Sequence, residues 1–221
     1  MKGDGASEED ERAVSSLIER GLSELSIPVN TEQVFKLTRL ISLLSEWAGR
    51  INLTGHRDPI EMAERLVLDA AALSQSLPEL DRASHLADLG SGVGFPGLPI
   101  AILRPSLAVY LVESRLKRHH LQREIRRQLD LTRVISILGR SNEVEARSSD
   151  IVVAQAMAQP RKALELMRAW VRPGGVVALP ASETAEQPDL PDGYADLSLR
   201  EYRVPTTGRR RKLWVATVDP R

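Results

Sequence analysis

The chain has 221 residues, enough for one sizeable core, so a single domain with an appendage is the default expectation. Lys plus Arg (30) equals Asp plus Glu (30), so no overall field indicates a polyanionic partner and any nucleic-acid surface must be local. The absence of cysteine excludes disulfides, thiolate metal sites and a cysteine nucleophile, and four scattered histidines argue against a metal site. An acidic N-terminus and the lack of a long apolar run predict a cytoplasmic protein without signal peptide or membrane span.

The first third of the chain carries helical patterns only. We expect residues 1–12 to form a disordered acidic tail, and residues 13–82 to form a helical cap on the rest of the molecule. Asn30 or Thr31 can begin a helix whose apolar residues recur at helical spacing: Val34, Leu37, Leu40, Ile41, Leu44 and Trp47. Asp58 and Glu61 form a capping-box-like pair around Pro59, which predicts a further helix to about residue 77.

From residue 84 onward, short β-rich segments alternate with amphipathic helices. The expected strands are 84–89, 107–112, 133–138, 150–154 and 176–179, and the expected helices are 97–103, 115–129 and 160–171. This alternation indicates a mostly parallel sheet with right-handed crossovers. Segments 196–203 and 211–218 have no helix between them, so the sheet should end in an antiparallel hairpin. The prediction is an α/β, Rossmann-like domain over 83–221 with a seven-stranded, mostly parallel sheet.

A glycine turn follows the first expected strand. Glycine tolerates positive φ and lets backbone N–H groups approach a ligand, and doubly wound sheets hold nucleotide-like cofactors at such turns. Gly92-x-Gly94-x-x-Gly97 fits the dinucleotide fingerprint, but the turn starts at Gly90, and in that frame Phe95 replaces the third glycine. These residues favour S-adenosylmethionine over NAD.

Four polar side chains near the expected strand ends could contact such a cofactor. Asp88 would repel a pyrophosphate but suits a cationic group; it either meets the methionine part or caps the turn. Glu113 ends the second strand, where a carboxylate can accept hydrogen bonds from both ribose hydroxyls. Ser141 and Asn142 follow the third strand and either contact adenine or cap a helix.

Two basic clusters stand out in a chain of zero net charge. The helix expected at 115–129 has one acid, Glu124, and eight basic or histidine residues: Arg115, Lys117, Arg118, His119, His120, Arg123, Arg126 and Arg127. The second cluster, before and within the last strand, consists of Arg209, Arg210, Arg211 and Lys212. Each cluster either is a solvated face or contacts a phosphate backbone.

Several motifs occur together in a recognisable order. They are Trp-Ala-Gly-Arg-Ile-Asn-Leu-Thr-Gly-His-Arg-Asp (47–58), Leu68-Asp69, Asp-Leu-Gly-Ser-Gly-Val-Gly-Phe-Pro-Gly-Leu-Pro (88–99), Val-Glu-Ser (112–114) and Lys117-Arg118. In these motifs the chain resembles the bacterial small-subunit rRNA guanine-N7 methyltransferases, the glucose-inhibited division protein B family, over roughly residues 30–180.

The resemblance implies an activity, a partner and a set of site residues. Members use S-adenosylmethionine to methylate N7 of a guanine in 16S rRNA near the decoding site, so the expected partner is the small ribosomal subunit and the expected state a monomer without metal. The implied cofactor-binding residues are Asp88, Gly90, Ser91, Gly92, Gly94, Phe95, Glu113, Ser141, Asn142 and Gln155. The resemblance places Asn52, Thr54 and Arg57 near the mouth of the pocket, where Asn52, Thr54 and Gln155 would align the substrates. Together with the two basic clusters, the expected RNA-binding residues are Arg57, Arg115, Lys117, Arg118, Arg209, Arg210 and Arg211.

The chain departs from the family pattern at four positions. Leu66 replaces a histidine, Ala70 a serine, Gln155 an arginine, and Pro180 a lysine. These losses keep two alternatives open: a catalytically weak or silent paralogue that binds cofactor and RNA or protein, and a small-molecule methyltransferase.

Overall fold

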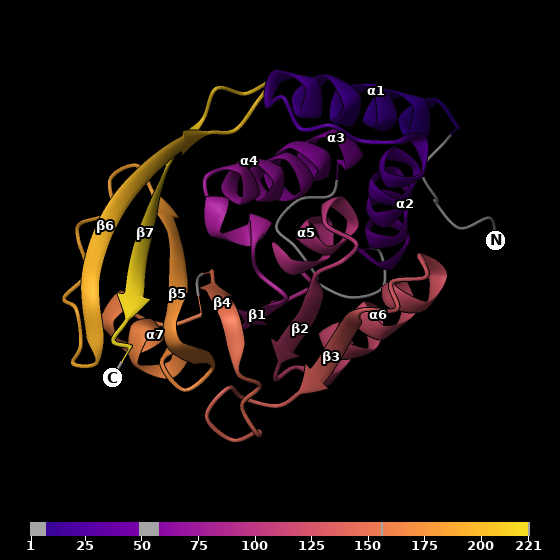
Figure 1. The fold of residues 1–221 in the computed structure, drawn as a ribbon. Coiled ribbons are helices and arrows are strands. Elements are labelled where there is room, and N and C mark those ends of the chain that lie inside the picture. Colours follow the sequence, from indigo (N-terminus) through magenta and orange to yellow (C-terminus); the bar gives the residue numbers. More distant parts are fainter. Residues whose placement is uncertain (1–7, 49–57, 156, 221) are drawn as a thin grey trace.

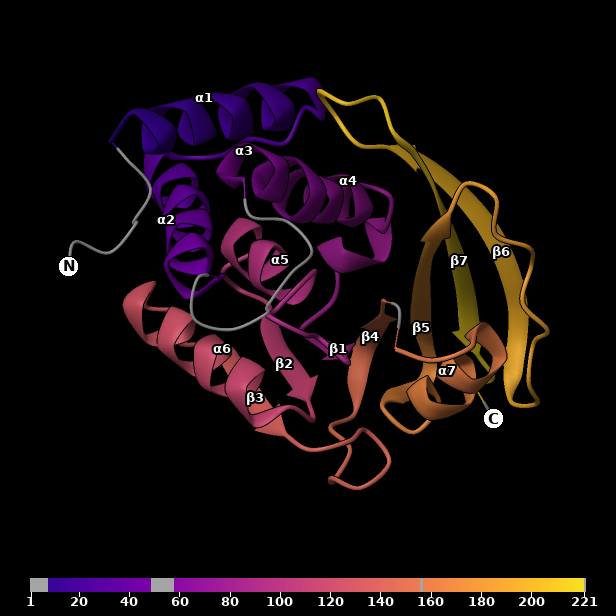
Figure 2. The same cartoon turned by 180° about the vertical axis from the view of Figure 1, so that it is seen from behind.

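The computed structural model describes residues 8–48, 58–155 and 157–220 and begins with helices (Figures 1 and 2). Helix α1 spans Glu8–Glu24, α2 Thr31–Ala48, α3 Pro59–Met62 and α4 Asp69–Gln75, with a 3₁₀ turn at Pro78–Asp81. The expected tail at 1–12 is wrong for residues 8–12, because α1 already includes them. Its first turn holds Glu8, Glu9, Asp10 and Glu11, and acidic side chains stabilise a helix N-terminus.

The sheet has the predicted seven strands, in the order β3-β2-β1-β4-β5-β7-β6. Their bounds are β1 His85–Leu89, β2 Ala108–Glu113, β3 Val134–Leu138, β4 Ser149–Ala154, β5 Val171–Ser182, β6 Tyr194–Arg203 and β7 Arg210–Val218. Strands β1 to β5 pair in parallel, and β7 pairs antiparallel with both β5 and β6. The mostly parallel sheet and its antiparallel C-terminal hairpin are therefore confirmed.

The two faces of the sheet are covered by different helices. Helices α5 (Gly97–Leu103) and α6 (Leu116–Gln128) pack on one face together with α1, α2 and α4, while α7 (Pro160–Met167) packs on the other. Figure 1 shows the N-terminal helices gathered around α5, whereas α7 lies apart, beside β5. Successive side chains of a strand point to opposite faces of the sheet, and this alternation produces the two layers. Leu86 packs in the apolar core with α5 and α6, whereas the next residue, Ala87, packs in the core with α7.

Two expected elements differ in extent. Helix α7 ends at Met167 instead of 171, because Val171 already begins β5. The strand expected at 176–179 is longer than predicted, since β5 begins at Val171, and residues 173–175 lie where the pairing between β4 and β5 shifts register. Gly174 adopts φ +70° there, a conformation that glycine tolerates without strain.

The helix expected from residue 58 to 77 contains a π-helical turn, Ala63–Leu68, between α3 and α4. Asp58 caps its start as predicted, because the carboxylate accepts hydrogen bonds from the Ile60 and Glu61 amides, both at 3.3 Å. A π turn inserts one residue and so rotates the residues that follow. Leu66, inside this turn, is half-buried, and Asp69, the first residue after it, is buried.

Asp69 ties the N-terminal helices to the C-terminal hairpin. Its Oδ1 accepts a hydrogen bond from the Tyr202 hydroxyl at 2.9 Å, and its Oδ2 lies 3.5 Å from Nη1 of Arg211. Tyr202 and Arg211 are cross-strand partners in β6 and β7, so both side chains project toward α4. Burial raises the pKa of Asp69, while Arg211 and the Tyr202 hydroxyl act in the opposite direction.

Replacement of Asp69 by alanine should lower the free energy of unfolding by about 3–5 kcal/mol, because Arg211 would stay buried without its partner. Urea denaturation of Asp69→Ala measures the loss. Asp81→Ala is the matched control, since it removes an ion pair with Arg104 in which the Asp81 side chain is 71% exposed. Asp81→Ala should lower the free energy of unfolding by at most about 1 kcal/mol. Equal losses in the two variants would contradict the prediction.

Candidate functional site

The predicted glycine turn leaves β1 with positive φ at Gly90 (+68°), Gly92 (+59°) and Gly94 (+106°). These angles require glycine or impose strain on any other residue. Packing adds a second restriction at Gly90, because a Cβ there would lie 2.9 Å from Cγ of Met157. The turn therefore holds the backbone close to the segment that follows β4.

Asp88 forms a hydrogen bond across the glycine turn, to the start of α5. It is fully buried, and its Oδ2 accepts a hydrogen bond from the Gly97 N–H at 2.9 Å, which fixes the start of α5. Burial, with a smaller effect from the nearby Glu113, raises the pKa of Asp88 to about 7, although the Gly97 hydrogen bond acts in the opposite direction. Of the two roles left open for this residue, the structure shows the cap; contact with the cofactor's methionine part stays a prediction.

A cavity of about 370 Å³ opens where β1, β2 and β3 end. Its walls combine apolar and polar groups: Gly90, Val112, Ser114, Gly139, Arg140, Ser141, Asn142, Met157 and Leu166. This volume is within the range of small-molecule sites, and apolar walls with a few polar groups suit an adenosine. Helix capping, the alternative for Ser141 and Asn142, is wrong because β4 follows this segment without a helix.

Glu113 ends β2 at the edge of this cavity, next to Ser114. It is 4% exposed, and its Oε1 accepts a hydrogen bond from the Arg115 N–H at 2.7 Å. Its Oε2 lies 3.9 Å from Nη1 of Arg118. The carboxylate thus sits beside the glycine turn, as the sequence predicts for a group that binds ribose hydroxyls.

Gln122 is a site residue that the sequence reasoning missed. Its fully buried amide donates to Ser91 Oγ at 2.9 Å and to the Gly92 carbonyl at 2.7 Å. The side chain therefore braces the glycine turn from α6. No local motif marks it, because a glutamine among helical cations has no pattern that indicates an inward orientation.

A second, small cavity joins the turn to the N-terminal helices. It is lined by Arg65, Leu66, Asp69, Ala70, Leu73, Phe95, Pro96 and Gln155. This cavity is therefore lined by three of the four residues that depart from the family pattern: Leu66, Ala70 and Gln155. Pro180, the fourth, lies in β5 opposite Leu213. Phe95 and Gln155 line this cavity and not the adenosine-sized one.

The predicted RNA-binding residues separate into exposed and buried groups. Arg115 and Lys117 are exposed at the start of α6. Arg209 is exposed and lines a cavity of about 240 Å³ with Arg65 and Asp69. Arg210 is exposed as well and lies 3.8 Å from Glu183.

Arg211 contradicts its predicted role, since it is 8% exposed and paired with Asp69. A buried guanidinium held by a carboxylate is not available to an RNA phosphate. Asn52, Thr54 and Arg57 fall outside the described residues. Within the described ranges, no group of three or more His, Asp or Glu side chains could hold a metal ion. Those ranges also contain no helix long and apolar enough to span a membrane.

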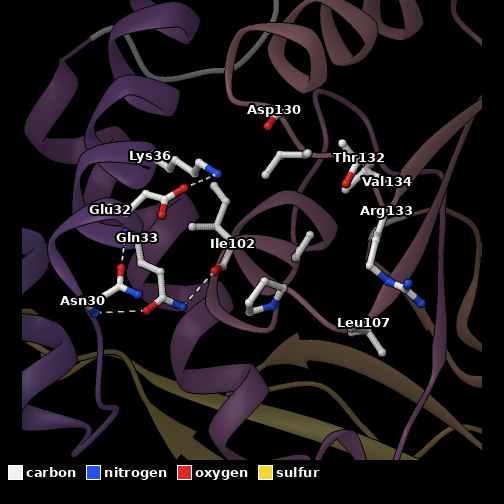
Figure 3. Close-up of a pocket in the computed structure, with 13 residues that line it drawn as sticks. Asn30, Glu32, Gln33, Lys36, Ile102, Leu107, Asp130, Thr132, Arg133 and Val134 are labelled. Carbon is white, nitrogen blue, oxygen red and sulfur yellow. Dashed lines mark hydrogen bonds and ion pairs between the residues drawn. The ribbon is translucent and has the colours of Figure 1, made fainter.

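A further cavity, of about 150 Å³, lies at the opposite edge of the sheet, near the starts of β2 and β3 (Figure 3). The polar side chains that the start of α2 contributes bond to one another and to the backbone. Lys36 Nζ lies 2.8 Å from Glu32, and the Gln33 amide donates to the Ile102 carbonyl at 3.0 Å. Asn30 and Gln33 cap α2 reciprocally, which confirms the predicted start of that helix. This cavity is a joint between α2 and α5 and holds no predicted site residue.

The raised pKa of Asp88 predicts a pH dependence of stability. The folded state keeps this proton up to a pH of about 7, whereas the unfolded chain releases it near 3.8, so the free energy of unfolding should fall as pH rises between these values. Asp88→Asn, which cannot ionise, should flatten this slope in urea denaturations at several pH values.

Asp150→Asn is the control, because Asp150 should change the free energy of unfolding with pH in the opposite direction to Asp88. Burial raises the pKa of Asp150, but hydrogen bonds from Arg172 and the Ser84 and His85 amides outweigh it and hold the pKa below its usual value. Asp150 therefore stabilises the fold above the unfolded-state pKa, and its replacement should remove a contribution that rises with pH. A wild-type slope unchanged in Asp88→Asn would contradict the assignment.

Solved structures share this fold. A putative O-methyltransferase from Klebsiella pneumoniae superposes with a TM-score of 0.61 at 14% identity, covering 95% of this chain and 99% of its own. A variant of MtNAS solved with S-adenosylmethionine gives a TM-score of 0.58 at 16% identity, covering 97% of this chain and 80% of its own. At these identities the likeness shows the Rossmann-like methyltransferase fold.

Sequence relatives are more specific. The ribosomal RNA small subunit methyltransferase G of Chromohalobacter salexigens is 32% identical over 203 residues, 91% of this chain and 96% of the relative. The protein of the same name from Stenotrophomonas maltophilia is 34% identical over 211 residues, 93% of this chain and 95% of the relative. The family model described as rRNA small subunit methyltransferase G matches residues 33–213, which include the glycine turn, both cavities beside it and nearly the whole sheet. The chain belongs to the rRNA small subunit methyltransferase G (GidB) family.

Proposed function

We propose that this chain transfers a methyl group from S-adenosylmethionine to N7 of a guanine in 16S rRNA of the small ribosomal subunit. The observation that carries the proposal is the family match over residues 33–213, which includes the adenosine-sized cavity beside the glycine turn. The proposed enzyme acts as a monomer in the cytoplasm, where small ribosomal subunits are found. Residues 13–82 serve as a helical cap, and residues 83–221 form the cofactor-binding domain.

The residues around the larger cavity fit the cofactor. Val112, Met157 and Leu166 provide apolar walls for the adenine, and Ser141 and Asn142 provide hydrogen-bonding groups at its rim. The Glu113 carboxylate accepts hydrogen bonds from the ribose hydroxyls. Bound S-adenosylmethionine supplies the methyl group, and the positive-φ turn at Gly90, Ser91, Gly92 and Gly94 leaves room beside the backbone for its methionine part.

The chemistry demands little of the side chains. Guanine N7 is an unprotonated ring nitrogen with a free lone pair, so its methylation needs no general base. The chain has to hold the two substrates in line, which is a matter of orientation. Phe95 and Gln155 line the small cavity next to the turn and are the described residues proposed to align the guanine.

The exposed cations near the cavities support an RNA substrate. Arg115 and Lys117 follow directly on Glu113 and Ser114, which border the cofactor cavity. Arg209 shares its cavity with Arg65 and with three acids, Glu61, Glu64 and Asp69, so this margin has no excess of cations. The exposed Arg115 and Lys117 are therefore the cations that favour a polyanion over a small-molecule substrate.

One observation favours the second candidate, a weak or silent RNA-binding paralogue. Leu66, Ala70 and Gln155 make one cavity largely apolar where the family pattern would place ionisable and polar groups. Arg65 is the cation that remains among its lining residues. The two candidates differ in turnover and agree on cofactor binding.

Glu113→Ala should weaken the binding of S-adenosylmethionine strongly, because each hydrogen bond to a charged group contributes about 1.5–3 kcal/mol. Isothermal titration calorimetry measures the loss. Glu145→Ala is the control, since the Glu145 side chain is 84% exposed and pairs with Arg147, which does not line the cavity, so affinity should stay unchanged. A wild-type protein that binds NADH and not S-adenosylmethionine would overturn the proposed cofactor.

Gln155→Arg tests whether the lost charge limits the enzyme. If the arginine regains one phosphate contact, the dependence of log affinity on log salt should steepen by roughly 0.7–0.9, and methyl transfer to small ribosomal subunits should rise most at low salt. The assay follows wild type and variant across a salt series. Robust wild-type turnover that the arginine leaves unchanged would show that the charge is dispensable here. Absence of N7-methylation by wild type, with intact cofactor binding, would favour the silent paralogue.

A further inference from the structure

Arg118 is oriented differently from the other cations at the start of α6. Its side chain is 27% exposed, and its Nη1 lies 3.9 Å from Oε2 of the buried Glu113. The same Nη1 is 3.8 Å from the position that a Cβ on Gly92 would occupy. The guanidinium therefore lies against both parts of the proposed cofactor site, the glycine turn and the ribose-binding carboxylate.

The helical spacing supports this inward orientation. Arg118 and Gln122 are four residues apart on α6, and residues at that spacing lie on one face of a helix. Gln122 is fully buried and bonds to Ser91 and Gly92. This face of α6 is thus directed at the glycine turn, whereas Arg115 and Lys117 are exposed to solvent.

Glu113 needs a neighbouring cation. Its carboxylate is 4% exposed and lies close enough to Asp88 for the two acids to interact unfavourably. A buried charge is costly unless it is paired and hydrogen-bonded. The Arg115 N–H satisfies Oε1, and Arg118 is the cation that the structure places beside Oε2.

We propose that Arg118 is a positioning residue of the cofactor site, which holds the Glu113 carboxylate oriented toward the ribose hydroxyls, and that it does not contact RNA. The terminal torsion of a glutamate is broad, so a carboxylate fixed at one oxygen alone can still change its orientation. Contacts at both oxygens remove that freedom before the cofactor arrives. This role rests on the proposed function, because it requires that S-adenosylmethionine binds at Glu113.

The first test compares two neighbouring cations. Arg118→Gln should weaken the binding of S-adenosylmethionine and of S-adenosylhomocysteine by calorimetry, each by a factor on the order of 10, about the value of one hydrogen bond to a charged group. Arg118→Lys, which keeps the charge, should recover part of the loss. Lys117→Gln should leave both affinities unchanged and instead lower the salt slope of binding to small ribosomal subunits by roughly 0.7–0.9.

A double-mutant cycle separates positioning from general damage to the fold. If Arg118 acts through Glu113, then Arg118→Gln should cost no further cofactor affinity in a Glu113→Gln background. A loss of the same size in both backgrounds would overturn the proposal, as would unchanged affinity in Arg118→Gln. A lower salt slope in Arg118→Gln would overturn it too, because it would mean a phosphate contact. If the wild-type protein does not bind S-adenosylmethionine, both the proposed function and this role of Arg118 are overturned. If wild type and Arg118→Gln bind it equally well, only the role of Arg118 is refuted.

Discussion

Two neighbouring parallel strands each place a buried carboxyl group near the same edge of the sheet, and a backbone amide holds one oxygen of each. Gly97 donates to Asp88, which is fully buried, and Arg115 donates to Glu113, which is 4% exposed. The first bond demands glycine at 97, because a Cβ there would lie 2.9 Å from the Asp88 carboxylate and 2.4 Å from a Leu111 methyl. The second fixes the chain as it leaves β2 for α6. The helices on either side of the glycine turn are thus oriented by the hydrogen bonds to these two carboxyl groups.

Much of the fold could be predicted from the sequence because it depends on local patterns. Alternating apolar residues and glycine breaks located the strands, and the missing helix before β7 identified the hairpin. The cavity beside the glycine turn could also be anticipated, since parallel strands end at a common edge and their following residues must meet there.

One wrong prediction and two features that the sequence did not reveal concern side chains whose environment is set by distant partners. Arg211 stands in a run of exposed-looking cations, yet a carboxylate on α4 and its own strand pairing bury it. Asp69 is buried against Tyr202 and Arg211 of the C-terminal hairpin. Gln122 belongs to a basic helix and still faces the glycine turn. In each case the decisive contact joins segments far apart in the chain, which a reading by local periodicity does not include.

The order of the strands has a consequence for how the molecule is made. Strand β7 is the last to be synthesised, yet it lies between β5 and β6 and pairs with both. Thr206 in the loop before it donates to Glu24 at the end of α1, so this late segment also reaches the first helix (Figure 1). The edge of β5 therefore stays unpaired until β7 has been synthesised and has folded onto it. An unpaired edge is a template for aggregation, so β5 is exposed to this risk between its own synthesis and its pairing with β7.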